Sequence, residues 1–387
     1  MIVIHGTKRI GALVIVAGVV LAACTGGTLS ASPSTPPGAG SPASGGGGAA
    51  VANQLNGAGS TFIFPLLSKM GEAYNEQTGV RLNYQSIGSG GGIKAWTENT
   101  VDFGASDAFL QDSEIQAAAG KGEPVEIPAT FGAVVVAYNL PGLTAPIRMT
   151  PDAIAGLFDG RITKWNDPVL SAANPGVTLP ATDVSVVHRS DGSGTTSIFT
   201  TYLTSVSDEW VQKVGAGDGT KSAGKTVEWP TGLGASGNEG VTQGINQTEG
   251  GVGYIELAYA LQNKIPFADV QNKSGAYVTP SLASVTAAAN LPSYPSDLRF
   301  NLVNTEAADG YPITGTTWLI VYRDLSKVLG SKERASALVS FLWWAIHDGQ
   351  SLAAPLYYGS LPDGLLKQDE AAVRSINWSG EGLLPTQ

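Results

Sequence analysis

Short β-like runs, many of them continuously apolar, alternate with helical patterns along most of this chain, and this alternation constrains the fold more than any other feature. Runs of this kind are typical of strands that are buried on both faces of a sheet. They are Leu82–Tyr84, Phe131–Tyr138, Val184–Val187, Val252–Ile255 and Thr316–Tyr322. Between them, apolar residues recur at helical spacing, as at Phe64, Leu67 and Met70. The pattern predicts an α/β fold with mixed or parallel sheets.

Length and composition narrow the class of protein further. A chain of 387 residues is longer than one core usually grows, which favours two lobes, and 43% hydrophobic residues leave ample material for them. The net charge of −10 argues against a nucleic-acid partner. One cysteine and three histidines argue against a disulfide framework and a metal site, so we expect no metal and no cofactor.

The N-terminus has the pattern of a sorting signal. Lys8 and Arg9 precede an apolar run over 10–21, which is too short to span a bilayer, and Leu21-Ala22-Ala23-Cys24 follows. This resembles a bacterial lipoprotein signal with its lipobox. We therefore expect residues 1–23 to be a signal peptide, Cys24 to carry lipid, and the Gly/Ser/Pro-rich remainder of 24–52 to be a flexible tether. The alternative is a lone buried cysteine in an N-terminal helix.

Three segments share one physical character, a glycine- or hydroxyl-rich turn that follows extended chain and opens a helix. They are 57–62 (GAGSTF), where Thr61 can cap the next helix, 88–92 (GSGGG) and 189–195 (RSDGSGT). Helix N-termini present unpaired N–H groups and positive partial charge, so three of them together would form an anion site. Arg189 suits bidentate contact with an oxyanion. Each turn alone is an ordinary helix cap, but the three together favour an anion site.

From about Gly57 to its end, the chain resembles the high-affinity phosphate-binding proteins, the substrate-binding lipoproteins of bacterial ABC phosphate importers. The resemblance rests on runs in matching order and spacing, at 57–62, 88–92, 99–108 (NTVDFGASDA), 164–168 (KWNDP), 189–195 and 253–256 (GYIE). It implies a two-lobed periplasmic-binding-protein fold of type II, the Venus-flytrap arrangement, with mixed sheets flanked by helices.

The resemblance also implies a set of phosphate ligands. Phe62 and Gly194 would act through backbone N–H groups, and Arg189 would supply the positive charge. The full set is Thr61, Phe62, Ser89, Asp107, Arg189, Ser193, Gly194 and Thr195. Asp191 resembles the carboxylate that orients this arginine, an exposed Asx-turn being the alternative.

Asp107 is the residue expected to select the ligand. An ionised carboxylate only accepts hydrogen bonds, and phosphate near neutral pH keeps a proton to donate, whereas sulfate has none. A site of this kind binds phosphate and rejects sulfate. The alternative is that Asp107 merely caps the following helix.

Other functions fit the sequence less well. A serine hydrolase could pair Ser193 with His188, but no Gly-x-Ser-x-Gly elbow surrounds Ser193. A metallo-phosphatase would need a cluster of His and Asp ligands, but this chain has only three histidines. Of these, His347 is better explained as favouring the C-terminus of a helix. Tryptophans that could line a carbohydrate face lie in apolar patterns typical of a core. A binding protein for another tetrahedral oxyanion, sulfate or molybdate, remains the main alternative.

We therefore expect a lipid-anchored monomer on the extracytoplasmic face of the cell membrane that binds inorganic phosphate between two lobes. Residues 53–129 plus 310–387 would form lobe I, and residues 130–309 lobe II. Phosphate would pass to the ABC-type import permease without chemical change, so the protein would not be an enzyme. Closure would be favoured because only the closed state makes both sets of contacts.

Overall fold

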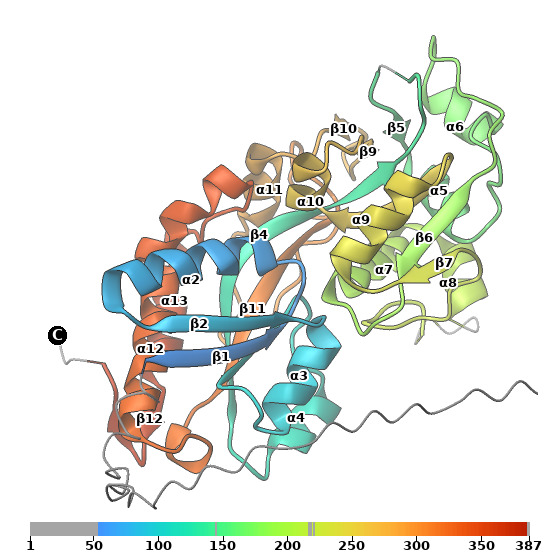
Figure 1. Cartoon of the computed structure of the whole chain (residues 1–387). Coiled ribbons are helices and arrows are strands. Elements are labelled where there is room, and N and C mark those ends of the chain that lie inside the picture. Colours follow the sequence, from blue (N-terminus) through green and yellow to red (C-terminus); the bar gives the residue numbers. More distant parts are fainter. Residues whose placement is uncertain (1–52, 144, 216–218, 220, 385–387) are drawn as a thin grey trace, which may run out of the picture. The chain divides into compact units, whose positions relative to one another are not determined.

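The computed structural model describes residues 53–143, 145–215, 219 and 221–384, which all lie within one compact unit (Figure 1). The expected signal peptide, Cys24 and the tether lie outside the described residues. Across those ranges, no helix is both long and apolar enough to cross a membrane.

An eight-stranded mixed sheet in the order β2-β1-β3-β11-β4-β8-β6-β7 organises the fold (Figure 1). Its strands are β1 (Gln54–Gly59), β2 (Arg81–Ser86), β3 (Phe103–Ser106), β4 (Pro124–Tyr138), β6 (Ser185–Arg189), β7 (Leu233–Ala235), β8 (Gly251–Glu256) and β11 (Thr314–Tyr322). The five strand-like runs identified in the sequence fall on these strands, except that Val184 lies one residue before β6. Burial on both faces holds for β4, β8 and β11 but not for β2, whose residues lie at the sheet edge and alternate between exposed and half-buried.

Strand β4 joins two halves of this sheet. Its residues from Pro124 to Ala133 pair antiparallel with β11, and from Val134 to Tyr138 it pairs antiparallel with β8. On one side of this junction β1 runs parallel to β2 and β3, and on the other β6 runs parallel to β7 and β8. The expected α/β fold with mixed sheets is confirmed, and the partner switch along β4 lies between the two halves of the sheet.

Helices cover both halves of the sheet. The half of the sheet that contains β1, β2 and β3 is covered by α2 (Phe64–Thr78), α3 (Ser89–Thr97), α4 (Asp112–Ala118), α12 (Lys332–Ile346), α13 (Asp363–Arg374) and the 3-10 turns η1 (Leu325–Lys327), η2 (Asp348–Leu352) and η3 (Ala354–Leu356). The second half is covered by α5 (Pro151–Phe158), α6 (Pro168–Ala173), α7 (Gly194–Val206), α8 (Asp208–Val214), α9 (Gly237–Gln247) and α10 (Leu257–Gln262). Helix α11 (Leu282–Ala289) packs against β4 and β11. Short strands complete the fold: β5 (Arg148–Met149), β9 (Asp269–Gln271), β10 (Tyr277–Val278), β12 (Asn377–Trp378) and β13 (Glu381–Gly382).

Two of the expected helix starts differ from the sequence prediction. Thr61 does not cap α2, whose N-cap residue is Ile63 and has no side-chain cap hydrogen bond, and Thr61 Oγ1 accepts from Asn238 instead. Helix α3 begins at Ser89 and includes the three glycines that were expected to precede it. Gly92 lies so close to β1 that a Cβ would be 2.3 Å from the Cα of Gly59, so this close packing requires glycine inside the helix.

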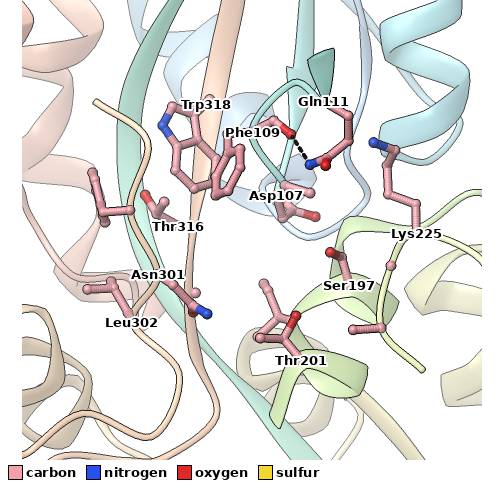
Figure 2. Close-up of a pocket in the computed structure, with 16 residues that line it drawn as sticks. Asp107, Phe109, Gln111, Ser197, Thr201, Lys225, Asn301, Leu302, Thr316 and Trp318 are labelled. Carbon is pink, nitrogen blue, oxygen red and sulfur yellow. Dashed lines mark hydrogen bonds between the residues drawn. The ribbon is translucent and has the colours of Figure 1, made fainter. Parts of the chain in front are cut away.

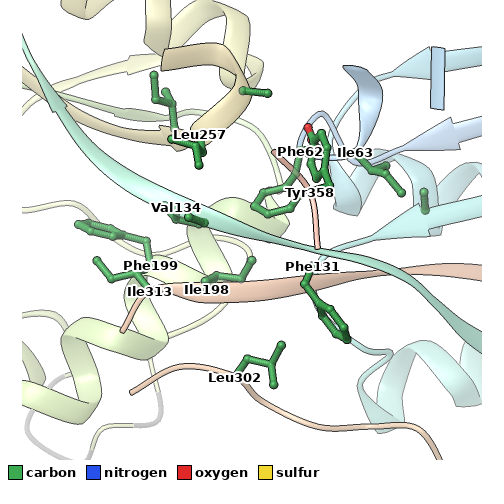
Figure 3. Packing of buried hydrophobic residues seen from close by; sticks show 14 of the residues in the cluster. Phe62, Ile63, Phe131, Val134, Ile198, Phe199, Leu257, Leu302, Ile313 and Tyr358 are labelled. Atoms are coloured by element: carbon green, nitrogen blue, oxygen red, sulfur yellow. The ribbon is translucent and has the colours of Figure 1, made fainter. Parts of the chain in front are cut away.

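The core is continuous across the strand junction (Figure 3). Phe131, Val134 and Ile313 are fully buried around β4 and β11, and Ile198 of α7 packs against the same strands. A Cβ at Gly315 would lie 2.2 Å from Ile198 Cδ1, so the glycine lets α7 approach β11. The helix that opens at Gly194 is thereby held against a strand of the first half.

Candidate functional site

The three glycine- or hydroxyl-rich turns meet where the two halves of the sheet adjoin. The Gly194 N–H donates to Ser89 Oγ at 3.0 Å, and the Gly90 N–H donates to the Gly192 carbonyl at 2.8 Å. These bonds join the start of α3 to the start of α7. The expected convergence of helix N-termini is therefore present among the described residues.

Asp107 follows β3 and is hydrogen-bonded from several directions. Its Oδ1 accepts from Ser60 Oγ at 2.5 Å and Thr317 Oγ1 at 2.6 Å, and its Oδ2 accepts from Ser89 Oγ at 3.4 Å. Burial raises the pKa of the Asp107 carboxyl to about 6, against the opposing effect of these bonds and of the Arg189 charge. Asp107 therefore belongs to the interior of the site, which argues against its being only a helix cap.

Arg189 ends β6 and is paired with Asp191. Its Nε donates to Asp191 Oδ1 at 2.7 Å, and its Nη2 donates to Asp191 Oδ2, while Nη1 reaches Thr195 Oγ1 at 3.4 Å. Burial disfavours ionisation of Asp191, but the hydrogen bonds and charge of Arg189 outweigh it and hold the pKa of Asp191 below its ordinary value. Asp191 is thus paired with the Arg189 guanidinium through both carboxylate oxygens and is not an exposed turn.

Asn238, which the sequence did not single out, connects the first and third turns. Its Nδ2 donates to Thr61 Oγ1 at 2.8 Å and to Thr195 Oγ1 at 3.2 Å, and its backbone N–H also reaches Thr61 Oγ1 at 3.2 Å. Its Oδ1 accepts from the Glu256 N–H at 3.0 Å. One buried amide at the start of α9 therefore fixes both threonine hydroxyls.

Further residues missed by the sequence analysis are Ser60, Thr317, Tyr259 and Tyr358. Ser60 and Thr317 donate to Asp107, as described above, and the two tyrosine hydroxyls donate to backbone carbonyls of Thr61 and Phe62 at 2.6 and 2.7 Å. Only Ser60 carried a sequence signal, because it lies inside the 57–62 run.

The expected ligand residues are almost completely shielded from solvent. The side chains of Thr61, Ser89, Asp107 and Arg189 belong to residues that are at most 4% exposed. Phe62, Ser193, Gly194 and Thr195 are likewise buried. The Phe62 N–H is paired with Ser60 Oγ, and Ser193 Oγ caps α7 by accepting from the Thr196 N–H at 3.0 Å. The turns are thus arranged in a closed form.

A pocket of about 430 Å³ lies beside the site, with Asp107 on its wall (Figure 2). Segments from both halves of the sheet line it, including Thr201 of α7, Asn301 and Trp318 of β11. Lys225 at its margin pairs with Glu114 at 2.8 Å. The pocket therefore lies between segments that belong to the two halves of the sheet.

The arrangement does not support the hydrolase or metal alternatives. His188 Nδ1 lies 3.0 Å from the Arg189 carbonyl and its ring stacks on Trp229 at 5.0 Å, while Ser193 serves as a helix cap. Among residues 53–384 as described, no group of three or more His, Cys, Asp or Glu side chains could hold a metal ion. His347 follows α12, as predicted.

Comparison with known proteins identifies the family. The phosphate-binding protein PstS of Xylella fastidiosa (strain 9a5c) is 43% identical over 321 residues, which is 82% of this chain and 84% of that protein. PstS of Pasteurella multocida is 37% identical over 334 residues, or 86% of this chain and 93% of that protein. The chain belongs to the PstS family of phosphate-binding proteins. A family model described as the PBP superfamily domain also matches residues 44–348.

Solved structures support the fold of this PstS family member. A periplasmic phosphate-binding protein (PfluDING) bound with phosphate matches with a TM-score of 0.65 at 20% identity, over 82% of this chain and 93% of that one. A human phosphate binding apolipoprotein matches with a TM-score of 0.65 at 22% identity, over the same shares of the two chains. At these identities the likeness concerns the fold alone.

Proposed function

We propose that this PstS family member binds inorganic phosphate between its two lobes and delivers it to an ABC-type import permease. The observation that carries the proposal is the buried Asp107 carboxylate beside the Arg189 guanidinium, enclosed by three helix-opening turns. Arg189 and the N–H and hydroxyl groups of the turns would donate to phosphate oxygens. The PstS names of relatives at 37–43% identity support the same ligand.

Asp107 makes phosphate a better ligand than sulfate. Two hydroxyls already donate to its Oδ1, which leaves Oδ2, 3.4 Å from Ser89 Oγ, to accept a hydrogen bond from a ligand. A protonated phosphate can donate that hydrogen bond, whereas sulfate would bring a second acceptor against a buried carboxylate. We therefore place the other oxyanions second to phosphate.

The ligand set would be the one that the resemblance implies, with each member in the role expected. Thr61, Ser89 and Asp107 would contact phosphate from lobe I, and Arg189 and the residues that follow it from lobe II. The complete proposed set is Thr61, Phe62, Ser89, Asp107, Arg189, Ser193, Gly194 and Thr195. The Phe62 N–H would exchange its present partner, Ser60 Oγ, for the ligand.

The proposed lobes are residues 53–129 plus 310–387, and residues 130–309. The partner switch along β4 between Ala133 and Val134 supports a boundary near residue 130. Closed contacts such as that from Gly194 to Ser89 would break on opening, and the permease could read that difference. Because phosphate leaves unchanged, the protein would bind and release its ligand without catalysis.

An extracytoplasmic position with a lipid anchor at Cys24 completes the proposal. It rests on the lipobox pattern and on the family to which the chain belongs. A Cys24→Ser variant should appear in the soluble fraction, and a variant that stays with the membrane would contradict the anchor.

Titration calorimetry of the protein, freed of bound anion, tests the binding function. We expect one phosphate per chain and little or no response to sulfate or molybdate. A folded sample that binds no phosphate would overturn the proposal, and tighter binding of sulfate would transfer it to the alternative ligand.

A further inference from the structure

Glu256 is a fully buried carboxyl group at the junction between the lobes, and phosphate coordination does not require it. It ends β8 and is 0% exposed. Its register partner across the ladder is Val134, the first β4 residue that pairs with β8, and the preceding residue Ala133 pairs with β11. The side chain therefore lies where strand pairing passes from one half of the sheet to the other.

If Glu256 were ionised, the contacts around it would need more hydrogen atoms than the Tyr358 hydroxyl can supply. The Tyr358 hydroxyl oxygen lies 2.9 Å from Glu256 Oε2 and 2.7 Å from the Phe62 carbonyl oxygen. A phenol has one hydrogen, a backbone carbonyl can only accept, and an ionised carboxylate can only accept. With Glu256 ionised, one of these two short contacts would bring lone pairs together. A proton on Glu256 removes the conflict, since the carboxyl then donates to Tyr358 and Tyr358 donates to Phe62.

The other oxygen of Glu256 supports the same assignment. Oε2 also accepts from the Ala258 N–H at 2.9 Å, but Oε1 is buried and has no hydrogen-bond partner. An unpaired oxygen of a neutral carboxyl is far less costly in an apolar interior than an unpaired oxygen of a carboxylate.

Burial and a neighbouring negative charge also favour the neutral form of Glu256. Burial raises the pKa of Glu256 to about 8, and the charge of Asp107 adds to this effect while the bonds from Ala258 and Tyr358 oppose it. The titratable groups that face Glu256 are Tyr358 beside η3, Tyr259 on α10 and Asp107 after β3. A phosphate anion near Asp107 would disfavour a charged Glu256 still more.

We propose that Glu256 is a neutral carboxylic acid in the closed protein, that it donates to Tyr358 and so positions the Phe62 peptide, and that phosphate binding favours this protonated form. The inference rests on the proposed phosphate function. Glu256 is a positioning residue, because it acts on the first turn through Tyr358. It joins the end of β8 to the Ser60–Phe62 turn, and its neutrality keeps a second negative charge from a site that already holds Asp107.

Infrared difference spectroscopy of the phosphate-saturated protein at neutral pH tests where the proton resides. In the wild type minus Glu256→Gln difference spectrum, which cancels other buried carboxyls such as Asp369, we expect the carbonyl stretch of a protonated carboxylic acid, and we expect this band to shift in Tyr358→Phe. Glu249→Gln, the same change at an exposed position before β8, serves as the matched control and should keep the band. If Glu256→Gln removes carboxylate bands instead, the proposal is wrong. Should Glu256→Gln not fold, an unshifted band in Tyr358→Phe would overturn it.

Calorimetry on the same variants tests the link to binding. As pH rises from about 6 to 9, the wild-type affinity for phosphate should fall relative to that of Glu256→Gln, by up to about tenfold per pH unit, since one proton is taken up. Comparison with the variant cancels the titration of phosphate itself. Parallel profiles would overturn the proposed linkage. A wild type that binds no phosphate at all would instead refute the phosphate function, so the two failures are distinguishable.

Discussion

The Gly194 N–H donates a 3.0 Å hydrogen bond to the Ser89 hydroxyl, across 105 residues of sequence. Ser89 opens α3 and Gly194 opens α7, so this bond joins the N-termini of two helices that belong to different halves of the sheet. Ser89 Oγ also donates toward Asp107 and accepts from its N–H. A single hydroxyl therefore connects the Asp107 carboxylate to the helix that follows Arg189, and separation of the two halves of the sheet would disconnect them.

Replacing Gly194 with alanine should obstruct this closed arrangement. A Cβ at Gly194 would lie 2.5 Å from both Asp107 Oδ2 and Ser89 Oγ, which is too close for either atom to remain in place. Overpacking of this kind costs about 1–3 kcal/mol, so phosphate affinity should fall by about fivefold to 150-fold in calorimetry. Gly364→Ala in α13 is the matched control, because nothing lies within 4 Å of its added Cβ. Equal affinities of the two variants would contradict the closed geometry.

The selectivity of Asp107 should depend on pH. Because burial raises the pKa of this carboxyl to about 6, the group is ionised at neutral pH and becomes a hydrogen-bond donor as the pH falls below that value. Competition by sulfate should therefore be negligible at about pH 7.5 and measurable at about pH 5. Asp107→Asn, which always offers a donor, should bind sulfate at both values. Sulfate competition that is independent of pH in the wild type would assign selectivity to another group.

The sequence predicted which turns lie together better than it predicted the contacts that join them. The turns at 57–62, 88–92 and 189–195 were recognisable because the N-terminus of a helix makes the same demand on backbone and residue type wherever it occurs. Asn238 and Thr317 were not, since a single amide or hydroxyl has no local pattern and acquires its role only through tertiary contact. The start of α3 was misplaced for a similar reason, because tertiary packing against Gly59 outweighs the low helix propensity of three glycines.

Lys225 and Glu114 should stabilise the closed form from the rim. Lys225 Nζ lies 2.8 Å from Glu114 Oε1, and both side chains are less than a quarter exposed, at 16% and 23%. A partly exposed pair of this kind contributes about 1 kcal/mol or less, so Lys225→Met should weaken phosphate binding by about two- to fivefold. In a double-mutant cycle, Glu114→Gln should add little to Lys225→Met. Fully additive losses would show that the two residues do not act as a pair.

Asp369 should destabilise the folded protein at neutral pH. It lies on the buried face of α13, it is 0% exposed, and neither carboxylate oxygen has a hydrogen-bond partner. Burial raises the pKa of this carboxyl well above its ordinary value of 3.8. Its contribution therefore does not lower the free energy of unfolding below about pH 4, and lowers it increasingly as the pH rises toward the pKa of the folded state.

Asp369→Asn should therefore raise the free energy of unfolding at about pH 7 by about 1–3 kcal/mol, and the gain should shrink toward about pH 4. Asp363→Asn removes the same charge from an exposed position at the start of α13 and should give no such gain. Urea denaturation of both variants across this pH range measures the difference. A loss of stability in Asp369→Asn at neutral pH would mean that the carboxylate has a stabilising partner in solution.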